Sequence, residues 1–267
     1  MAEVITSGQN PKIKTLMALQ EKSRERRQKG LFVLEGRREL EHALEAGFVL
    51  DTVFVCPEIL SLTNETPLLK AFLKDKPDVI EVSNSVYSKI AYREGTEGII
   101  AEVVTPERTL ASLALPENPL VMVLESVEKP GNLGAVLRSA DAAKADAVII
   151  CDPLTDLFNP NLIRASIGAI FTVPVVTATS AEAIKYLKDR KIQILTAQLQ
   201  DSSLYYETDM RGGTALVMGT EATGLTPVWR MAADAHIRIP MLGRLDSLNV
   251  SVSAAILLYE AVRQRQK

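Results

Sequence analysis

The chain has few of the residues from which metal and redox sites are usually built. Only two histidines and two cysteines occur among its 267 residues, and none of them shows the spacing of zinc ligands. Cys56 and Cys151 lie far apart, and both follow apolar, strand-like residues. We therefore expect two buried free thiols in a reducing environment, no disulfide, and no metal site.

Long hydrophobic runs and targeting signals are also missing. No apolar stretch approaches the roughly 18 residues that a membrane-spanning helix needs. The first residues, MAEVITSGQNPKIK, lack the basic and then apolar layout of a secretory signal. Hydrophobic residues make up 47% of the sequence, which is enough to form a core. These features predict a folded, soluble, cytoplasmic protein.

The net charge is small, but the charges are unevenly distributed. With 30 basic and 33 acidic residues the formal charge is −3, which by itself does not indicate nucleic acid. Between residues 12 and 38, however, nine lysines and arginines stand against three glutamates. Such a local patch attracts phosphates. A solvated helix face with charge pairs four residues apart explains the same pattern, and charge alone favours this second interpretation.

The first 105 residues alternate between helical and strand-like patterns. The first helix is predicted over residues 10–30, with Pro11 placed to begin it and Gly30 to end it. Strands are predicted at 31–36, 50–56, 78–83 and 98–104, and further helices at 37–47, 67–75 and 85–91. This pattern indicates a small α/β domain. Residues 106–118 contain two prolines and are predicted to be a linker.

Residues 119–267 show a more regular alternation without internal repeats. Apolar, β-branched runs predict strands at 120–125, 146–152, 173–176, 192–197, 215–219 and 236–240. Helical patterns separate most of them, at 132–145, 159–171, 180–190, 227–235 and from residue 247 onward. Strands that are apolar on both faces indicate a mainly parallel sheet covered by helices on both sides. Such sheets bind ligands at the carboxyl ends of their strands.

Three loops at predicted strand ends combine small residues with a few polar ones. Their polar and glycine residues are Asn132 and Arg138 in the first loop and helix, Gly219, Glu221 and Gly224 in the second, and Ser247 and Asn249 in the third. Taken singly, each has a structural explanation: Asn132 and Ser247 can cap helices, and the glycines can form turns. Arg138 is harder to explain, because a cation in an otherwise apolar helix must be paired, exposed or part of a site.

Taken together and in order, these segments resemble the SpoU (TrmH-like) branch of the SPOUT methyltransferases. The motifs are NLGAVLRSADAAKADAVII, VMGTEATGLT and IPMLGRLDSLNVSVSAAILLYE, and NLIRASIGAIFTVPVV between them matches at Arg164, Ser166 and Gly168. The N-terminal segments ITSGQNPKIKTL, FVLEGRRELEHALEAG and GTEGIIAEV resemble the small substrate-binding domain that many members carry. One departure is Thr96-Glu97-Gly98, which stands where the family often has Pro-Gln-Gly.

The resemblance implies a fold, an activity and a set of site residues. The implied fold is an α/β trefoil knot (residues 119–267) preceded by a small α/β RNA-binding domain (residues 1–105), and the resemblance also implies a homodimer through the C-terminal domain. The implied activity is methyl transfer from S-adenosylmethionine to a ribose 2′-hydroxyl of RNA, with 23S-type ribosomal RNA favoured. The implied catalytic residues are Asn132, Arg138, Glu221, Ser247 and Asn249. The implied cofactor-binding residues are Gly219, Ile239, Met241 and Leu248. Contacts to RNA are expected from Lys12, Lys14, Arg24, Arg26, Arg27, Arg37 and Arg38.

The role of Arg138 within this family assignment has two interpretations. It is sometimes described as the general base, yet an arginine keeps its proton up to a pKa above about 12. We favour a clamp that binds the phosphate next to the target ribose and stabilises the developing alkoxide.

Three other functions remain open from the sequence. A nucleotide-binding oxidoreductase of the Rossmann type would have an acidic residue at the end of the second strand, where Asp152 stands, but it also needs a GxGxxG motif that is missing. A 2′-O-methyltransferase acting on transfer RNA would carry the same three motifs. A non-catalytic RNA-binding protein would not need the five polar motif residues intact.

Overall fold

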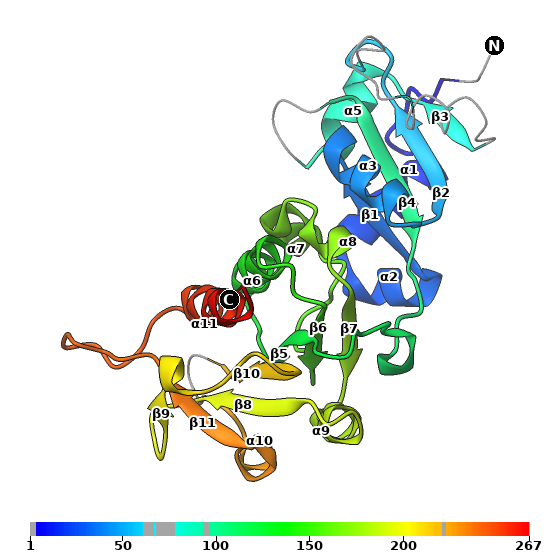
Figure 1. Ribbon diagram of the computed structural model, residues 1–267. Helices are drawn as coiled ribbons and strands as arrows, with labels where there is room; N and C mark the ends of the chain where they lie inside the picture. The colour runs from blue at the N-terminus through cyan, green and yellow to red at the C-terminus, as the bar shows by residue number, and fades with distance from the viewer. Residues whose placement is uncertain (1–3, 61–66, 68–77, 93–96, 221–222, 267) are drawn as a thin grey trace. The chain divides into compact units, whose positions relative to one another are not determined.

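The computed structural model describes residues 4–60, 67, 78–92, 97–220 and 223–266 (Figure 1). The chain forms two compact units. One comprises Met1–Pro106 together with Leu157–Ile163, and the other comprises Glu107–Asp156 together with Arg164–Lys267.

The N-terminal unit is built on a four-stranded sheet with the order β1-β4-β2-β3. The strands are β1 (Leu31–Glu35), β2 (Leu50–Val55), β3 (Val79–Glu81) and β4 (Ile99–Val104). Strand β4 runs antiparallel to β1 and β2, whereas β2 and β3 are parallel. Helices α1 (Pro11–Glu21) and α5 (Asn84–Ile90) bury apolar side chains against one face of this sheet, and α3 (Arg37–Glu45) follows β1. These strands and the helices α3 and α5 agree with the sequence prediction.

The prediction of one helix over residues 10–30 is wrong. Helix α1 ends at Glu21, Lys22 is extended, and α2 (Ser23–Lys29) then begins. The cause is Arg26, whose guanidinium is buried and donates hydrogen bonds to the carbonyls of Leu19 at 2.6 Å and Gln20 at 3.1 Å. It thereby satisfies carbonyl groups that the end of α1 leaves without a helical partner. The helix predicted at 67–75 lies, apart from residue 67, outside the described residues.

The C-terminal unit contains a seven-stranded sheet in the order β7-β6-β5-β10-β8-β11-β9. All its strand pairs are parallel, which confirms the predicted sheet type. Its strands are β5 (Leu120–Glu125), β6 (Ala147–Cys151), β7 (Val175–Ala178), β8 (Gln193–Ala197), β9 (Ser203–Leu204), β10 (Thr214–Met218) and β11 (Ala235–Arg238). Only the short β9 was not predicted.

Helices cover both faces of this sheet (Figure 1). Helices α9 (Ser180–Asp189) and α10 (Pro227–Ala232) pack on one face, where Trp229 and Leu187 are fully buried. Helices α6 (Pro130–Ala142), α8 (Ala169–Thr172) and α11 (Val250–Arg265) lie on the other. The C-terminal unit begins at Glu107, within the predicted linker, and Leu113 is buried in its core.

Two predicted helices have different boundaries. The helix predicted at 159–171 is divided into α7 (Pro160–Ser166) and α8, because Ile167 and Gly168 adopt positive φ angles of 52° and 88°. The last helix begins at Val250 rather than at residue 247. Cys56 and Cys151 are buried free thiols, as predicted. None of the described helices is long and apolar enough to cross a membrane.

Candidate functional site

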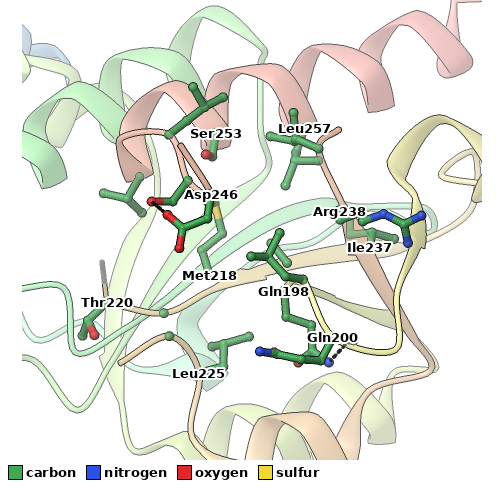
Figure 2. Close-up of a pocket in the computed structure, with 18 of the residues that line it drawn as sticks. Gln198, Gln200, Met218, Thr220, Leu225, Ile237, Arg238, Asp246, Ser253 and Leu257 are labelled. Atoms are coloured by element: carbon green, nitrogen blue, oxygen red, sulfur yellow. Dashed lines mark hydrogen bonds between the residues drawn. The ribbon is translucent and has the colours of Figure 1, made fainter. Parts of the chain in front are cut away.

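A cavity of about 410 Å³ lies at the carboxyl ends of β8, β10 and β11 (Figure 2). Its volume is in the range of small-molecule sites. Leu225, Ile237, Ile239 and Leu257 contribute apolar surface. Most of its remaining lining comes from the loops that follow these strands and from the first turns of α11. The position agrees with the expectation that a parallel sheet binds ligands at its strand ends.

The loop after β10 folds back on itself at the cavity. Gly219 and Gly224 come so close that a Cβ atom on Gly219 would lie 2.2 Å from the carbonyl oxygen of Gly224. The N–H of Gly224 donates to the carbonyl of Thr220 at 3.0 Å, and Gly224 has a φ of 66°. The close approach therefore requires glycine at position 219, and the positive φ favours glycine at position 224. Glu221, between them, lies outside the described residues.

Asn132 and Asn249 meet although they come from opposite ends of the C-terminal unit. The Nδ2 of Asn249 donates to the Oδ1 of Asn132 at 3.1 Å. The Oδ1 of Asn249 accepts from the backbone N–H of Ser251 at 2.9 Å, so Asn249 is the N-cap of α11. This corrects the expected cap at Ser247, whose hydroxyl instead lies 3.3 Å from a carboxylate oxygen of Asp246. Asn132 is not a cap either, since Lys129 precedes α6 and Pro130 opens it.

Arg138 is exposed further along α6. Its side chain makes no hydrogen bond or ion pair with the part of the chain that the structure describes. It does not line the cavity, whereas Gly219 and Ser247 do. The structure thus brings Asn132 and Asn249 together and places Ser247 at the cavity, but it leaves Arg138 on an open surface.

The four residues predicted to bind a cofactor all line the same cavity. Gly219 comes from the loop after β10, and Ile239, Met241 and Leu248 come from the segment between β11 and α11. Leu248 is 38% exposed, so it retains apolar surface that a ligand can cover. Their role in binding a cofactor stays a prediction.

Comparisons with known proteins agree with these motifs. The sequence profile described as the SpoU rRNA Methylase family matches residues 119–259, and that of the MRM3-like substrate binding domain matches residues 10–101. The chain belongs to the SpoU rRNA methylase family. The 23S rRNA (guanosine-2'-O-)-methyltransferase RlmB of Salmonella typhimurium is 35% identical, over 95% of this chain and 97% of that protein.

Solved structures of the family share the fold over nearly the whole chain. A crystal structure described as an RNA 2'-O ribose methyltransferase is 40% identical, covers 99% of this chain and 100% of its own, and has a TM-score of 0.82. An AdoMet-bound rRNA methyltransferase from Sinorhizobium meliloti is 29% identical, covers 98% of both chains and has a TM-score of 0.88.

A buried polar network holds the second family motif to the sheet. Glu125, at the end of β5, is 3% exposed and accepts hydrogen bonds from the backbone N–H of Thr226 at 2.8 Å and from its hydroxyl at 2.6 Å. The hydroxyl of Ser180 donates to Asp152 at 2.6 Å and accepts from the indole N–H of Trp229 at 2.9 Å. These contacts fix the start of α10, and hence one end of the glycine loop, to the strand ends.

The loop after β8 is a wall of the cavity that the sequence analysis missed. Its residues Gln198, Leu199 and Gln200 line the cavity together with Arg238 at the end of β11. The order of the strands places β8 between β10 and β11, next to both family motifs. The sequence does show two glutamines just after this apolar strand, which could have marked the loop as polar. It does not show that β8 lies beside β10 and β11, because strand order cannot be derived from local patterns.

The basic residues of the N-terminal unit differ in accessibility. Lys12, Lys14, Arg24, Arg27 and Arg38 are exposed on α1, α2 and α3. Arg26 is 4% exposed and bound to backbone carbonyls, so its predicted contact with RNA is replaced by a structural role.

Glu97 occupies the position where the family pattern departs. A carboxylate oxygen of Glu97 accepts from the backbone N–H of Arg37 at 2.5 Å, and the other lies 3.7 Å from the Arg37 guanidinium. Glu97 therefore stabilises the start of α3, where a negative charge is favoured by the helix dipole. Thr96 lies outside the described residues.

Proposed function

We propose that the chain transfers a methyl group from S-adenosylmethionine to a ribose 2′-hydroxyl of 23S-type ribosomal RNA. The full-length relative named above acts on a guanosine 2′-hydroxyl of this RNA, and the Sinorhizobium structure was solved with AdoMet bound. The observation that carries the proposal is one cavity walled by the second and third family motifs and flanked by the Asn132–Asn249 pair.

The cavity fits the cofactor in size and chemistry. A volume of about 410 Å³ suits a ligand of this size, and the apolar side chains Leu225, Ile239 and Leu248 suit a flat adenine ring. Gly219, Ile239, Met241 and Leu248 are the residues that we expect to hold it. When bound, the cofactor supplies a methyl group activated by its sulfonium. Around it, the protein must orient the ribose hydroxyl and exclude competing water.

We assign the remaining motif residues to the RNA side of the reaction. The exposed guanidinium of Arg138 can bind the phosphate next to the target ribose with two parallel hydrogen bonds and stabilise the developing alkoxide. Asn132 and Glu221 hold the ribose, and Ser247 with Asn249 orients its hydroxyl. In this assignment the arginine stays protonated throughout and acts as a clamp, not as a base.

The N-terminal unit supplies the binding surface for the RNA. Its match to a substrate binding domain and its exposed basic residues support this role. The proposed contacts come from Lys12, Lys14, Arg24, Arg27, Arg37 and Arg38. Specificity would then follow from RNA shape and exposed single-stranded loops.

Assembly, topology and location complete the proposal. The exposed Val252 and Tyr259 on α11 support a homodimer through the C-terminal unit, because apolar residues on one helix face are suited to an interface. Strand β11 lies next to the edge strand β9, yet the helix α11 that follows it in the chain packs against α6, β5 and β10 in the middle of the sheet. This return of the chain supports a trefoil knot. Ribosomal RNA as substrate implies action in the cytoplasm.

Labelled-methyl transfer with purified ribosomal and transfer RNA tests the reaction and the role of Arg138. Wild-type protein should label ribosomal RNA, and Arg138→Lys should reduce kcat by about 100-fold, because a lysine keeps the charge but not the two parallel hydrogen bonds. Full activity of Arg138→Lys would contradict the clamp. Labelling of transfer RNA alone would favour the tRNA-modifying alternative, and no labelling of either RNA would favour a non-catalytic binding protein.

A further inference from the structure

Gln198, in the loop after β8, lines the cavity and carries a buried hydrogen-bond acceptor. Its Nε2 donates to the carbonyl of Gln200 at 2.9 Å (Figure 2). Its backbone N–H donates to the carbonyl of Ile237 at 3.0 Å, which ties the residue to the end of β11. The Oε1 atom is buried and has no hydrogen-bond partner among the residues that the structure describes.

The orientation of this amide is determined by its neighbour. Rotating the amide by 180° would bring Oε1 against the Gln200 carbonyl, and two acceptors repel each other. The free group is therefore the carbonyl oxygen. A buried acceptor without a donor is destabilising, so a ligand that brings a donor is favoured there.

The chemistry of the cavity indicates which donor of the ligand would bind the Oε1 atom of Gln198. The cofactor proposed above has three kinds of donor: the adenine 6-amino group, the ribose hydroxyls and the α-ammonium. An ammonium is better placed beside the carboxylate of Asp246, which also lines the cavity and lies apart from Gln198 (Figure 2). Hydroxyls accept as well as donate and do not require a pure acceptor. The 6-amino group is a donor on a flat ring, and Ile239, which lines the same cavity, offers apolar surface for such a ring.

We propose that Oε1 of Gln198 accepts a hydrogen bond from the 6-amino group of adenine and so makes the site select adenine over a 6-oxopurine. The inference rests on the proposed function. Gln198 is a specificity-determining residue in this account, with no part in the methyl transfer itself.

Calorimetric binding of two product analogues tests this role without any turnover. S-adenosylhomocysteine carries the 6-amino group, whereas S-inosylhomocysteine carries a 6-oxo group that would face the Gln198 oxygen. Wild-type protein should bind the adenosyl compound at least about tenfold more tightly, as expected for losing one buried hydrogen bond. In Gln198→Leu and Gln198→Ala this ratio should fall to within about twofold. Both ligands are compared on the same variant, so a change in its folded fraction cancels in the ratio.

Gln28→Leu is the matched control. Gln28 is exposed on α2 and does not line the cavity, so this variant should keep the wild-type ratio. An unchanged ratio in both Gln198 variants would overturn the role of Gln198 while leaving the proposed function in place. Failure of the wild-type protein to bind either compound would overturn the proposed function and this inference together.

Discussion

Asn249 carries two tasks on one side chain. Its Oδ1 caps α11 through Ser251, and its Nδ2 reaches Asn132 at the start of α6. The two helices pack against each other, so this contact joins the first and third family motifs. The cap needs only an oxygen, whereas the contact with Asn132 needs a donor. The two tasks can therefore be separated by substitution.

Replacing Asn249 by aspartate should remove the donor to the Oδ1 of Asn132 and keep the cap. Aspartate caps helices as well as asparagine does, so the free energy of unfolding should change by less than about 0.5 kcal/mol. Methyl transfer should fall at least about tenfold, because aspartate offers no donor to Asn132. Urea unfolding and transfer kinetics measure the two effects. Asn249→Ala, which removes the cap as well, should in addition lose about 1 kcal/mol of stability. Normal transfer by Asn249→Asp would refute the role of the pair.

Glu102 is a buried carboxyl on β4 of the N-terminal unit. It is 6% exposed, and its Oε1 has no hydrogen-bond partner in the described part of the chain. Burial, and secondarily the carboxylate of Asp51, raise the pKa of Glu102 to about 7, against the smaller opposing effects of Lys29 and Lys12. The folded protein therefore holds this proton more tightly than the unfolded chain, in which the pKa is 4.5. Ionisation of Glu102 makes the fold less stable as the pH rises from about 4.5 to 7.

Glu102→Gln should remove this pH dependence. The variant should be more stable than the wild type by about 1–2 kcal/mol at pH 8, once screening by solvent is allowed for, and the difference should disappear near pH 4.5. Urea unfolding at both pH values measures it. Glu107→Gln, at an exposed position, controls for the loss of one negative charge. A stability difference that is the same at both pH values would show that the pKa of Glu102 is not raised in the folded protein.

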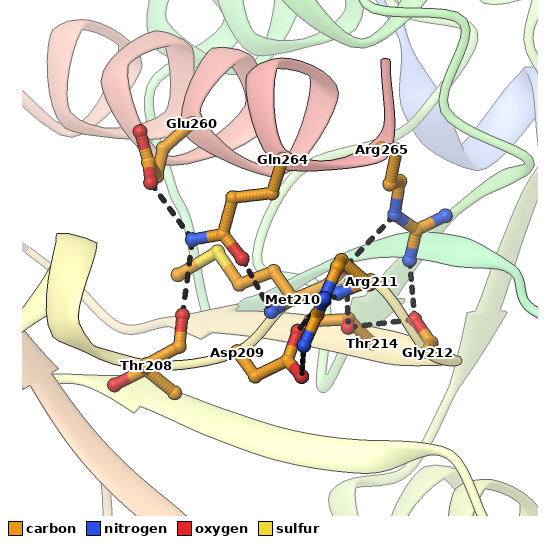
Figure 3. A network of polar contacts seen from close by, with 9 residues as sticks. All are labelled: Thr208, Asp209, Met210, Arg211, Gly212, Thr214, Glu260, Gln264 and Arg265. Atoms are coloured by element: carbon orange, nitrogen blue, oxygen red, sulfur yellow. Dashed lines mark hydrogen bonds and ion pairs between the residues drawn. The ribbon is translucent and has the colours of Figure 1, made fainter. Parts of the chain in front are cut away.

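At the scale of elements, two side chains fasten the last turn of α11 to the segments that lead into β10 and β5 (Figure 3). Gln264 accepts from the N–H of Met210 at 2.8 Å and donates to the carbonyl of Thr208 at 3.0 Å. Arg265 donates to the carbonyls of Met210, Gly212, Asn118 and Pro119, at distances of 2.6–3.1 Å. Partial burial lowers the pKa of the Arg265 guanidinium. The helix that carries the third motif is thus held at both of its ends.

Arg265→Ala should lower the free energy of unfolding by about 2–3 kcal/mol, because four carbonyl groups lose a charged donor. Chemical denaturation measures this loss. Arg211→Ala is a suitable control, since Arg211 is exposed and, among the residues that the structure describes, its side chain binds only the nearby Asp209. It should change stability little. Equal effects of the two substitutions would contradict the fastening.

The elements were predictable from sequence wherever local residues decide them. Continuous apolar runs predicted β5, β6, β8 and β10, since buried parallel strands need apolar residues on both faces. The break between α1 and α2 was not predictable, because it depends on the Arg26 side chain turning back to α1. The N-cap of α11 was assigned to the wrong member of a polar pair, because Ser247 and Asn249 are both good caps. The site was predicted in two of its loops, but the loop after β8 enters it only through the strand order.

At the scale of the whole molecule, the two units divide the proposed work. The C-terminal unit contains the cavity and the three family motifs. The N-terminal unit matches a substrate binding domain and carries exposed basic residues on α1, α2 and α3, although the net charge of the chain is −3. Binding of RNA through such a patch should weaken as salt increases, because each phosphate contact releases counterions.

The most direct test of the account is the chemical position of the transferred methyl group. The protein would be incubated with methyl-labelled S-adenosylmethionine and unmodified 23S-type ribosomal RNA, and the RNA would then be digested to nucleosides and analysed by mass spectrometry. The account predicts label in the 2′-O-methylribose of one nucleoside, and much less label with Asn249→Asp. Label on a base, or no label in the ribosomal RNA, would contradict it.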